Sequence, residues 1–345
     1  MSVFRRRLMS ASGKEEEDPM EAMYLTFEAL EDGFQITKSG QDQPQYSIDG
    51  GVTWKSVHYS NKTVAINKGQ KMYLRGNLTP EDTYGIGRFT ANKKFRAKGN
   101  CMSLLFGDNA KDAYSLEGYD YAFLGLFNDC TALEDASSLK LQALVLSNAC
   151  YEKMFDDCTS LINAPVLPAM SLSRRCYYEM FIRCKSLKEA PKLPATTLAE
   201  YCYYGMFTVC SSLKSAPQLP AINLINNCYG YMFKGCVSLV NPPSLPATTL
   251  ADYCYSNMFL GCTSLVKAPE LPAENLKTNC YYTMFFNCSS LNYIKALFLT
   301  TPSASYTGSW VTGVASSGTF VKNKNATWNV IGEDGIPEGW DVVLE

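Results

Sequence analysis

Apolar residues in the middle of the chain recur at spacings that fit one face of a helix. Leu198, Cys202, Met206, Phe207 and Cys210 lie at relative positions 0, 4, 8, 9 and 12. At about 100° per residue, these positions cover one half of a helical cylinder. The pattern therefore predicts an amphipathic helix over residues 197–209.

A short extended segment is expected to follow that helix. Pro217 and Pro220 lie three residues apart and exclude a helix there. Its expected inward residues are Leu213, Ala216 and Leu219. Because proline lacks an amide donor, any strand is confined to the residues before Pro217.

This unit repeats every 26 residues. Residues 122–133 match a worn copy of it, and residues 101–106 match a more degraded one. A helix plus an extended segment at this period is the plan of a leucine-rich repeat, so we predict an α/β leucine-rich-repeat solenoid. Twelve of the fourteen cysteines form two columns with the same period: Cys150, Cys176, Cys202, Cys228, Cys254 and Cys280, and Cys158, Cys184, Cys210, Cys236, Cys262 and Cys288.

The repeat also resembles a known family. The phrases CYYGMFTVCSSLKSAPQLPA (202–221) and CYSNMFLGCTSLVKAPELPA (254–273) are similar to the BspA-type leucine-rich repeats of gut Bacteroidetes and of the phages that infect them. The resemblance covers roughly residues 100–300. It implies the solenoid fold, and it suggests a role in recognition or adhesion.

Two segments outside the array have a different texture. Residues 22–98 carry short alternating runs separated by turn signals, which predict a small β-sandwich. Within them, SIDGGVTW (47–54) resembles the Asp-box of sialidases, and we interpret it as a hairpin-stabilising turn. Residues 301–345 leave the period and resemble the ends of the same Bacteroidetes proteins. We therefore predict four segments: an N-terminal docking or disordered peptide (1–21), a β-sandwich (22–98), a solenoid with degenerate first units (99–300) and a β-rich cap (301–345).

The repeated side chains allow more than one interpretation. The cysteines are metal or redox ligands, cross-repeat disulfides, or small buried residues, and the absence of CxxC spacing favours burial. The tyrosine column from Tyr151 to Tyr281 is either a sugar-binding stripe or packing with its hydroxyls at the surface. The methionine column from Met154 to Met284 is expected in the core.

Positions that vary between units are the better binding candidates, because repeat proteins bind through side chains that the core does not need. The alternative is that these positions are solvent-exposed and vary without a role in binding. The candidate binding face consists of Lys188, Glu189, Lys214, Ser215, Val240, Asn241, Val266 and Lys267.

Composition narrows the function. The chain is 46% hydrophobic and 19% charged, and 31 basic against 33 acidic residues give no electrostatic case for nucleic acid. His58 is the only histidine, which disfavours histidine-dependent catalysis and multi-histidine metal sites. Asp129, Asp156 and Asp157 are isolated in the sequence. We therefore expect a non-enzymatic protein without a cofactor, and no apolar run predicts membrane insertion.

The first twenty residues start basic and lack the apolar core of a secretory signal, so no signal peptide is expected. An arginine-rich stretch in this segment is interpreted as either a docking peptide or a disordered end. It consists of Phe4, Arg5, Arg6, Arg7 and Leu8.

A recognition array without a secretion signal suits a phage protein, which assembles in the host cytoplasm and leaves by lysis. We expect a virion appendage protein of a phage that infects Bacteroidetes. Its N-terminus would contact other virion proteins, and its repeats a bacterial surface protein or glycan. Self-association is expected because appendages are commonly oligomeric. The alternatives are a BspA-type adhesin on the bacterial cell surface and an intracellular repeat scaffold.

Overall fold

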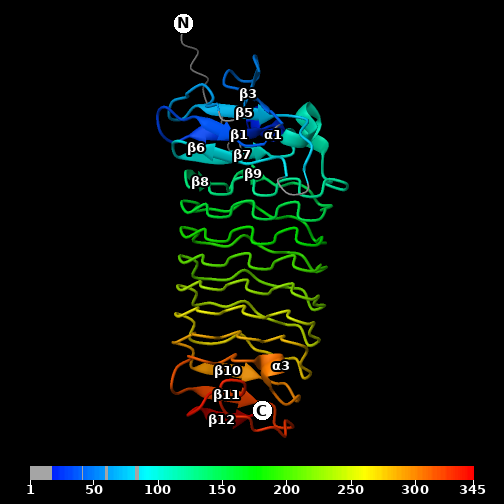
Figure 1. The fold of residues 1–345 in the computed structure, drawn as a ribbon, viewed down its shortest axis with the longest axis vertical. Helices are drawn as coiled ribbons and strands as arrows, with labels where there is room; N and C mark the ends of the chain where they lie inside the picture. The colour runs from blue at the N-terminus through cyan, green and yellow to red at the C-terminus, as the bar shows by residue number, and fades with distance from the viewer. Residues whose placement is uncertain (1–17, 41, 59–60, 82–84) are drawn as a thin grey trace, which may run out of the picture.

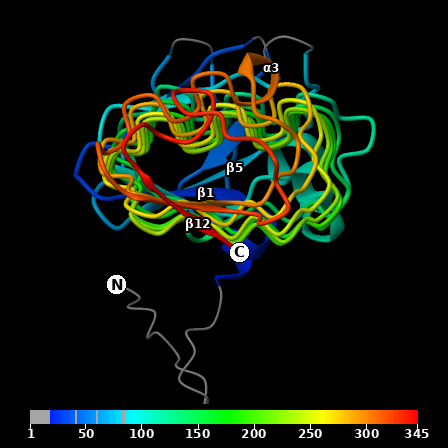
Figure 2. The same cartoon turned by 90° about the horizontal axis from the view of Figure 1, so that it is seen from below.

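The 26-residue units stack along the long axis of the molecule, each making one circuit that we call a rung (Figure 1). Seen along that axis, successive rungs superpose on one flattened outline (Figure 2). The computed structural model describes residues 18–345 apart from 41, 59–60 and 82–84. Every rung therefore contacts mainly the rung before it and the rung after it.

The predicted helix over 197–209 is wrong, and so is the leucine-rich-repeat solenoid with one helix per unit. The backbone is left-handed at every fourth residue, with φ values of 57° at Tyr201, 62° at Gly205 and 61° at Val209. A left-handed residue ends a right-handed helix. Among the described residues, none of the α-helices lies in the repeated rungs; they are α1 (Pro19–Met23), α2 (Ser103–Phe106) and α3 (Ala304–Thr307).

Backbone hydrogen bonds in this segment alternate between local turns and the next rung. The Tyr204 amide donates back to the Tyr201 carbonyl at 3.3 Å and closes a turn. The next amide, that of Gly205, donates to the Gly230 carbonyl of the following rung at 2.8 Å. The same alternation recurs in neighbouring rungs. Half of the donors that a helix would satisfy internally are thus directed to another rung.

The apolar spacing fits a period of four residues better than the helical 3.6. Cys202, Met206 and Cys210 are all fully buried in one rung. In a helix each would be rotated by about 40° from the one before. A second signal lies in the residues that occupy left-handed positions, because glycine and asparagine tolerate that conformation best. They include Gly205, Gly235, Gly261, Asn227, Asn257 and Asn279.

We expect Val209→Gly to stabilise the protein. Val209 is β-branched and left-handed, whereas the equivalent residues of the next two rungs are Gly235 and Gly261. Relief of about 1–2 kcal/mol of backbone strain exceeds the added entropy of glycine, about 0.5–1 kcal/mol. Chemical denaturation should show a net gain of about 0.5–1 kcal/mol. The control Ala199→Gly, at a position without positive φ, should lose a similar amount; equal effects of the two changes would contradict the strain.

The strands lie chiefly at the two ends of the stack. A 3₁₀ helix, η1 (Gly107–Asp112), follows α2. The strands are β1 (Leu25–Ala29), β2 (Ile36–Lys38), β3 (Gln45–Ser47), β4 (Lys55–Ser56), β5 (Lys71–Arg75), β6 (Phe89–Ala91), β7 (Phe95–Asn100), β8 (Leu133–Asp135), β9 (Leu139–Lys140), β10 (Tyr293–Ala296), β11 (Thr319–Lys322) and β12 (Asp341–Leu344).

The N-terminal strands continue into the stack. Their main sheet has the order β4-β3-β5-β1-β7-β8, and β7 pairs in parallel with both β8 and β9 of the repeat region. A separate ribbon, β2-β6, packs on it, with Phe27 of β1 edge-on to Phe89 of β6 at 5.4 Å. The β-sandwich predicted over residues 22–98 is therefore not a separate domain, because its main sheet and its core are shared with the rungs. At the other end, β10, β11 and β12 form a parallel sheet.

The Asp49 turn is a hairpin device, as predicted. It joins β3 to β4, which pair antiparallel. Asp49 accepts hydrogen bonds from the Ser47 hydroxyl at 2.7 Å and the Thr53 amide at 2.9 Å. The bonds from Thr53 lower the pKa of Asp49 to about 2. The carboxylate therefore holds the turn closed.

The core consists of side-chain columns that run through the rungs. Phenylalanines from Phe155 to Phe285 stack with centroids 5.2 to 5.8 Å apart. Tyrosines from Tyr151 to Tyr281 stack at 5.8 to 6.1 Å. The methionine column is fully buried, as expected. Repetition of one buried set fixes the register of every rung.

Candidate functional site

The eight predicted binding residues lie on one side of the stack. In each rung, the residues of this side come after the left-handed segment. At the C-terminal end of the stack the same side continues as β10, β11 and β12. We call it the ladder face, defined by Asn163, Glu189, Ser215, Asn241 and Lys267 with their neighbours. The left-handed segments, residues 199–210 and their equivalents, form the turn face, which stacks on α3. Figure 2 shows β12 and α3 on opposite sides of the outline.

All eight predicted residues are exposed. Their backbones lie between short parallel bridges, which join Asn163 to Glu189, Ser215 to Asn241, and Lys267 to Tyr293. Prolines such as Pro217 follow these positions and keep the pairing short. The side chains therefore project from a backbone that pairs with neighbouring rungs only at isolated positions.

The ladder is interrupted twice. The Val240 amide donates to the Lys214 carbonyl at 2.9 Å, and the Asn292 amide donates to the Val266 carbonyl at 3.0 Å. Within residues 99–300, which the structure describes throughout, no equivalent bond joins Lys214 to Lys188 or Val266 to Val240. We call the gap between Lys188 and Lys214 the first opening and the gap between Val240 and Val266 the second opening.

Hollows in the surface coincide with these openings. A hollow of about 830 Å³ lies at the first opening and is lined by Lys188, Glu189, Lys214 and Ser215. A second hollow, of about 560 Å³, is lined in part by Val240, Asn241, Lys267 and Tyr293. A third, of about 240 Å³, shares Lys188 and Ser212 with the first. The hollows thus bring together seven of the eight predicted residues, and Val266 is the one that lines none of them.

The two openings differ in charge. Among the described residues, neither Lys188 nor Lys214 has a carboxylate within salt-bridge distance, whereas Lys94 at the neighbouring hollow is paired with Glu134 at 3.0 Å. The first opening therefore offers two free ammonium groups against the one carboxylate of Glu189.

At the second opening, the Lys267 ammonium lies 4.6 Å from the centre of the Tyr293 ring. The Asn241 amide donates to the Ser215 hydroxyl at 2.9 Å, which links the residues of the two openings across one rung. Both openings carry groups that can form hydrogen bonds with a ligand.

The docking peptide lies outside the described residues. Phe4, Arg5, Arg6, Arg7 and Leu8 belong to residues 1–17. The described remainder of that predicted segment begins at Asp18, which caps α1 and pairs with Lys71 at 2.7 Å.

The cysteines are buried and free, which confirms their interpretation as small core residues. All six thiols of the second column also donate to carbonyls of the preceding rung; Cys210 Sγ, for example, lies 3.1 Å from the Phe181 carbonyl oxygen. Among the described residues, no group of histidine, cysteine and acidic side chains is placed to hold a metal ion. The thiols of the second column therefore connect rungs as hydrogen-bond donors.

We expect the thiols of the folded protein to resist modification. Burial raises the pKa of Cys202 to about 12, and the thiolate is the reactive form. At pH 8 the folded chain should react slowly with Ellman's reagent, whereas the denatured chain should titrate all fourteen thiols. Rapid reaction of several thiols without denaturant would contradict the burial.

The tyrosine column from Tyr151 to Tyr281 packs in the core. The expectation that its hydroxyls reach the surface is wrong for at least two members. The hydroxyls of Tyr151 and Tyr229 are buried without a hydrogen-bond partner. The tyrosines that reach the surface are instead the next residues in the chain, Tyr178 and Tyr204, whose rings stack at 5.1 Å on the turn face. In the sequence, the second tyrosine of the Cys-Tyr-Tyr phrase was the signal that could have identified these surface tyrosines.

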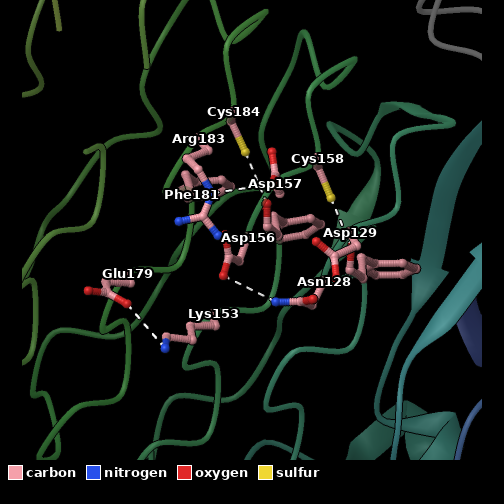
Figure 3. A network of polar contacts seen from close by, with 12 residues as sticks. Asn128, Asp129, Lys153, Asp156, Asp157, Cys158, Glu179, Phe181, Arg183 and Cys184 are labelled. Atoms are coloured by element: carbon pink, nitrogen blue, oxygen red, sulfur yellow. Dashed lines mark hydrogen bonds and ion pairs between the residues drawn. The ribbon is translucent and has the colours of Figure 1, made fainter. Parts of the chain in front are cut away.

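The structure also brings together acidic residues that are isolated in the sequence (Figure 3). Arg183 contacts Asp156 at 2.5 Å and Asp157 at 3.3 Å. One rung earlier, Asp129 pairs with Arg88 at 2.7 Å. These carboxylates therefore connect adjacent rungs on the turn face through arginine.

Asp156 should make stability depend on pH. Burial raises its pKa to about 6, although Arg183 and Lys153 oppose the shift. Between pH 4 and 6 the folded protein thus binds the proton of the Asp156 carboxyl group more tightly than the unfolded chain does. Its contribution to stability is present below pH 4 and is lost as pH rises through 6.

Relative to Asp156→Asn, the free energy of unfolding of the natural chain should fall by about 1–3 kcal/mol from pH 4 to pH 7. Urea denaturation of both chains across this range measures the difference. A difference that does not change with pH would exclude the raised pKa.

Within the described parts of the chain, no helix has the length and apolar character needed to cross a bilayer. No family model matches the chain, and no curated protein or solved structure matches it either.

Proposed function

We propose that the protein is a non-enzymatic recognition protein whose ladder face binds a protein or glycan on a bacterial surface. One observation carries this proposal. Seven exposed side chains that differ between repeats line neighbouring hollows on one face of a regular stack. Binding through such a face is the usual function of a stacked-repeat protein.

The division between core and surface supports this role. Leu213, Leu239 and Leu265 are equivalent, identical and fully buried. The residues that follow them are exposed and differ in type, with Lys214 next to the first and Val240 next to the second. Change at the exposed positions does not disturb the core, so the face is free to adapt to a ligand.

We propose a phage particle as the place where this face is displayed. The proposal rests on the resemblance of the repeats to proteins of Bacteroidetes phages, and on the arginine-rich start of the chain as a segment that docks on other virion proteins. A bacterial cell-surface adhesin and an intracellular scaffold are the alternatives.

Cell binding tests the ladder face. The full chain, labelled with a fluorophore, is titrated onto cells of gut Bacteroidetes strains. Changing Lys188, Glu189, Lys214 and Ser215 to alanine should weaken binding about tenfold or more, since lost charge-assisted contacts carry that effect. The control removes the same kinds of groups elsewhere, by changing Glu200, Lys234, Lys277 and Thr278 to alanine. Equal binding by both variants would overturn the proposal.

Quantitative mass spectrometry tests the location. Purified phage particles are compared with the envelope and cytosol of the host. Stoichiometric presence in particles is expected. Presence in the envelope alone would favour the adhesin, and presence in the cytosol of uninfected cells would favour the scaffold.

A further inference from the structure

We infer that the ladder face takes a linear acidic glycan, which lies along the stack and places an anionic group at the first opening. This inference rests on the proposed function and names its ligand class. It starts from the coincidence of three features at one place: an interrupted backbone ladder, a hollow, and two ammonium groups without ion-pair partners.

The first opening presents donors from both backbone and side chains. The Lys214 amide makes no backbone hydrogen bond to the preceding rung, and Lys188, Lys214 and Ser212 all line the hollow. Amides, hydroxyls and ammonium groups together suit a carboxylate, sulfate or phosphate oxygen. Among the described residues that line this hollow, Glu189 is the one acidic residue, so the net charge of the lining is positive.

The second opening suits an uncharged part of the same ligand. Its hollow is lined by Asn241, Ser244 and Tyr293, which offer an amide, a hydroxyl and an aromatic ring. Lys267 is held against the Tyr293 ring, and Lys295 is paired with Glu270 at 3.1 Å and with Glu345 at 2.7 Å. Its lysines are therefore engaged, unlike those of the first opening.

The spacing of the openings favours a chain of sugars. Equivalent residues of the two openings are separated by two rungs, which corresponds to about 10 Å at the usual distance between neighbouring strands. Two sugar residues of an extended polysaccharide span a similar length. A linear glycan that places an acidic group at the first opening would therefore bring the hydroxyl groups of a sugar two residues further along to the second opening.

The half-buried tyrosines of the turn face, Tyr178 and Tyr204, are a weaker candidate for sugar binding. The ring of Tyr178 is covered on one side by Tyr204 at 5.1 Å and lies 4.0 Å from the Arg175 guanidinium. Because stacked neighbours occupy its faces, little of the ring is free to stack on a sugar.

The test measures binding of the full chain to defined ligands by calorimetry. The ligands are oligogalacturonate as the carboxylated glycan, a sulfated dextran, a neutral β-glucan oligosaccharide, polyglutamate and inorganic phosphate. We expect binding to the acidic glycans, weakening with salt, and much weaker binding to the neutral glycan, to polyglutamate and to phosphate. Preference between carboxylate and sulfate identifies the anionic group.

Two sets of variants sharpen this test. Lys188→Gln with Lys214→Gln should weaken binding to acidic glycans about tenfold or more, and the control Lys234→Gln with Lys277→Gln should leave it unchanged. Glu189→Gln should strengthen binding, because it removes the carboxylate that repels the ligand. A loss of structure would not produce that gain.

The outcomes separate this inference from the proposed function. If the ladder-face alanine variant loses cell binding but no acidic glycan binds, the glycan is wrong and the recognition face stands. Tighter binding to polyglutamate than to the glycans would identify an acidic protein as the ligand. Binding to acidic glycans that ignores Lys188, Lys214 and Glu189 would overturn the site.

Discussion

Trp310→Ala should cost about 3–5 kcal/mol of stability, the range for truncating a fully buried large aromatic side chain. Trp310 is fully buried and stands one period after Met284, where it ends the methionine column. Its ring lies 6.2 Å from Tyr281 and 5.9 Å from Phe285, so it also covers the last members of both aromatic columns. Its indole nitrogen donates to the Gly335 carbonyl at 2.8 Å.

Equilibrium denaturation measures the loss, and size-exclusion chromatography should show more self-association than for the natural chain, because the variant leaves an apolar end of the stack uncovered. Trp54→Ala is the matched control. Trp54 is half-exposed against the Arg75 guanidinium at 4.0 Å, so its loss should cost far less. A cost below about 1 kcal/mol for Trp310→Ala would show that the C-terminal segment does not close the core.

Removing one whole rung should preserve the fold, whereas removing half a rung should destroy it. Deletion of residues 203–228 joins Cys202 to Tyr229 and brings Tyr177 next to Tyr229 in the same column. Each rung of the shortened chain still meets a neighbour with the same buried residues, and repeat stability is nearly a sum of neighbouring contacts. We expect a folded chain whose unfolding midpoint falls by a few degrees.

Deletion of residues 203–215 shifts all following residues by half a period. Cys228 and Cys236 then align with Glu189 and Thr197 of the preceding rung, and the inter-rung hydrogen bonds lose their partners. We expect loss of cooperative unfolding and aggregation, a cost of more than about 5 kcal/mol. Circular dichroism and thermal denaturation of both deletion variants show which of them keeps the fold and unfolds cooperatively. Equal behaviour of the two chains would show that register does not hold the rungs together.

For the candidate site, sequence comparison between units found the exposed positions but not their arrangement. Lys188 and Lys214 could be selected because they vary and are not needed by the core. The interruption of the ladder between them could not be predicted from the sequence. Ser215 and Lys267 are each bridged to the following rung but not to the preceding one, and the sequences around these positions are similar in all these rungs. Pairing on this face depends on distances between rungs, which no local pattern encodes. The contact of Asp156 and Asp157 with Arg183 was missed for the same reason.

The sequence by itself determined the period of 26 residues and predicted burial of the methionine and cysteine columns. Those features follow from spacing and hydrophobicity, which are local properties of the chain. Only the tertiary structure decided the path of the backbone between the columns. Cys202, Met206 and Cys210 are compatible with a helix and with turns of four residues, and over so short a segment the two periods differ little. The next rung decides between them, because it accepts hydrogen bonds from amides such as that of Gly205 and thereby stabilises left-handed residues that an isolated segment would avoid.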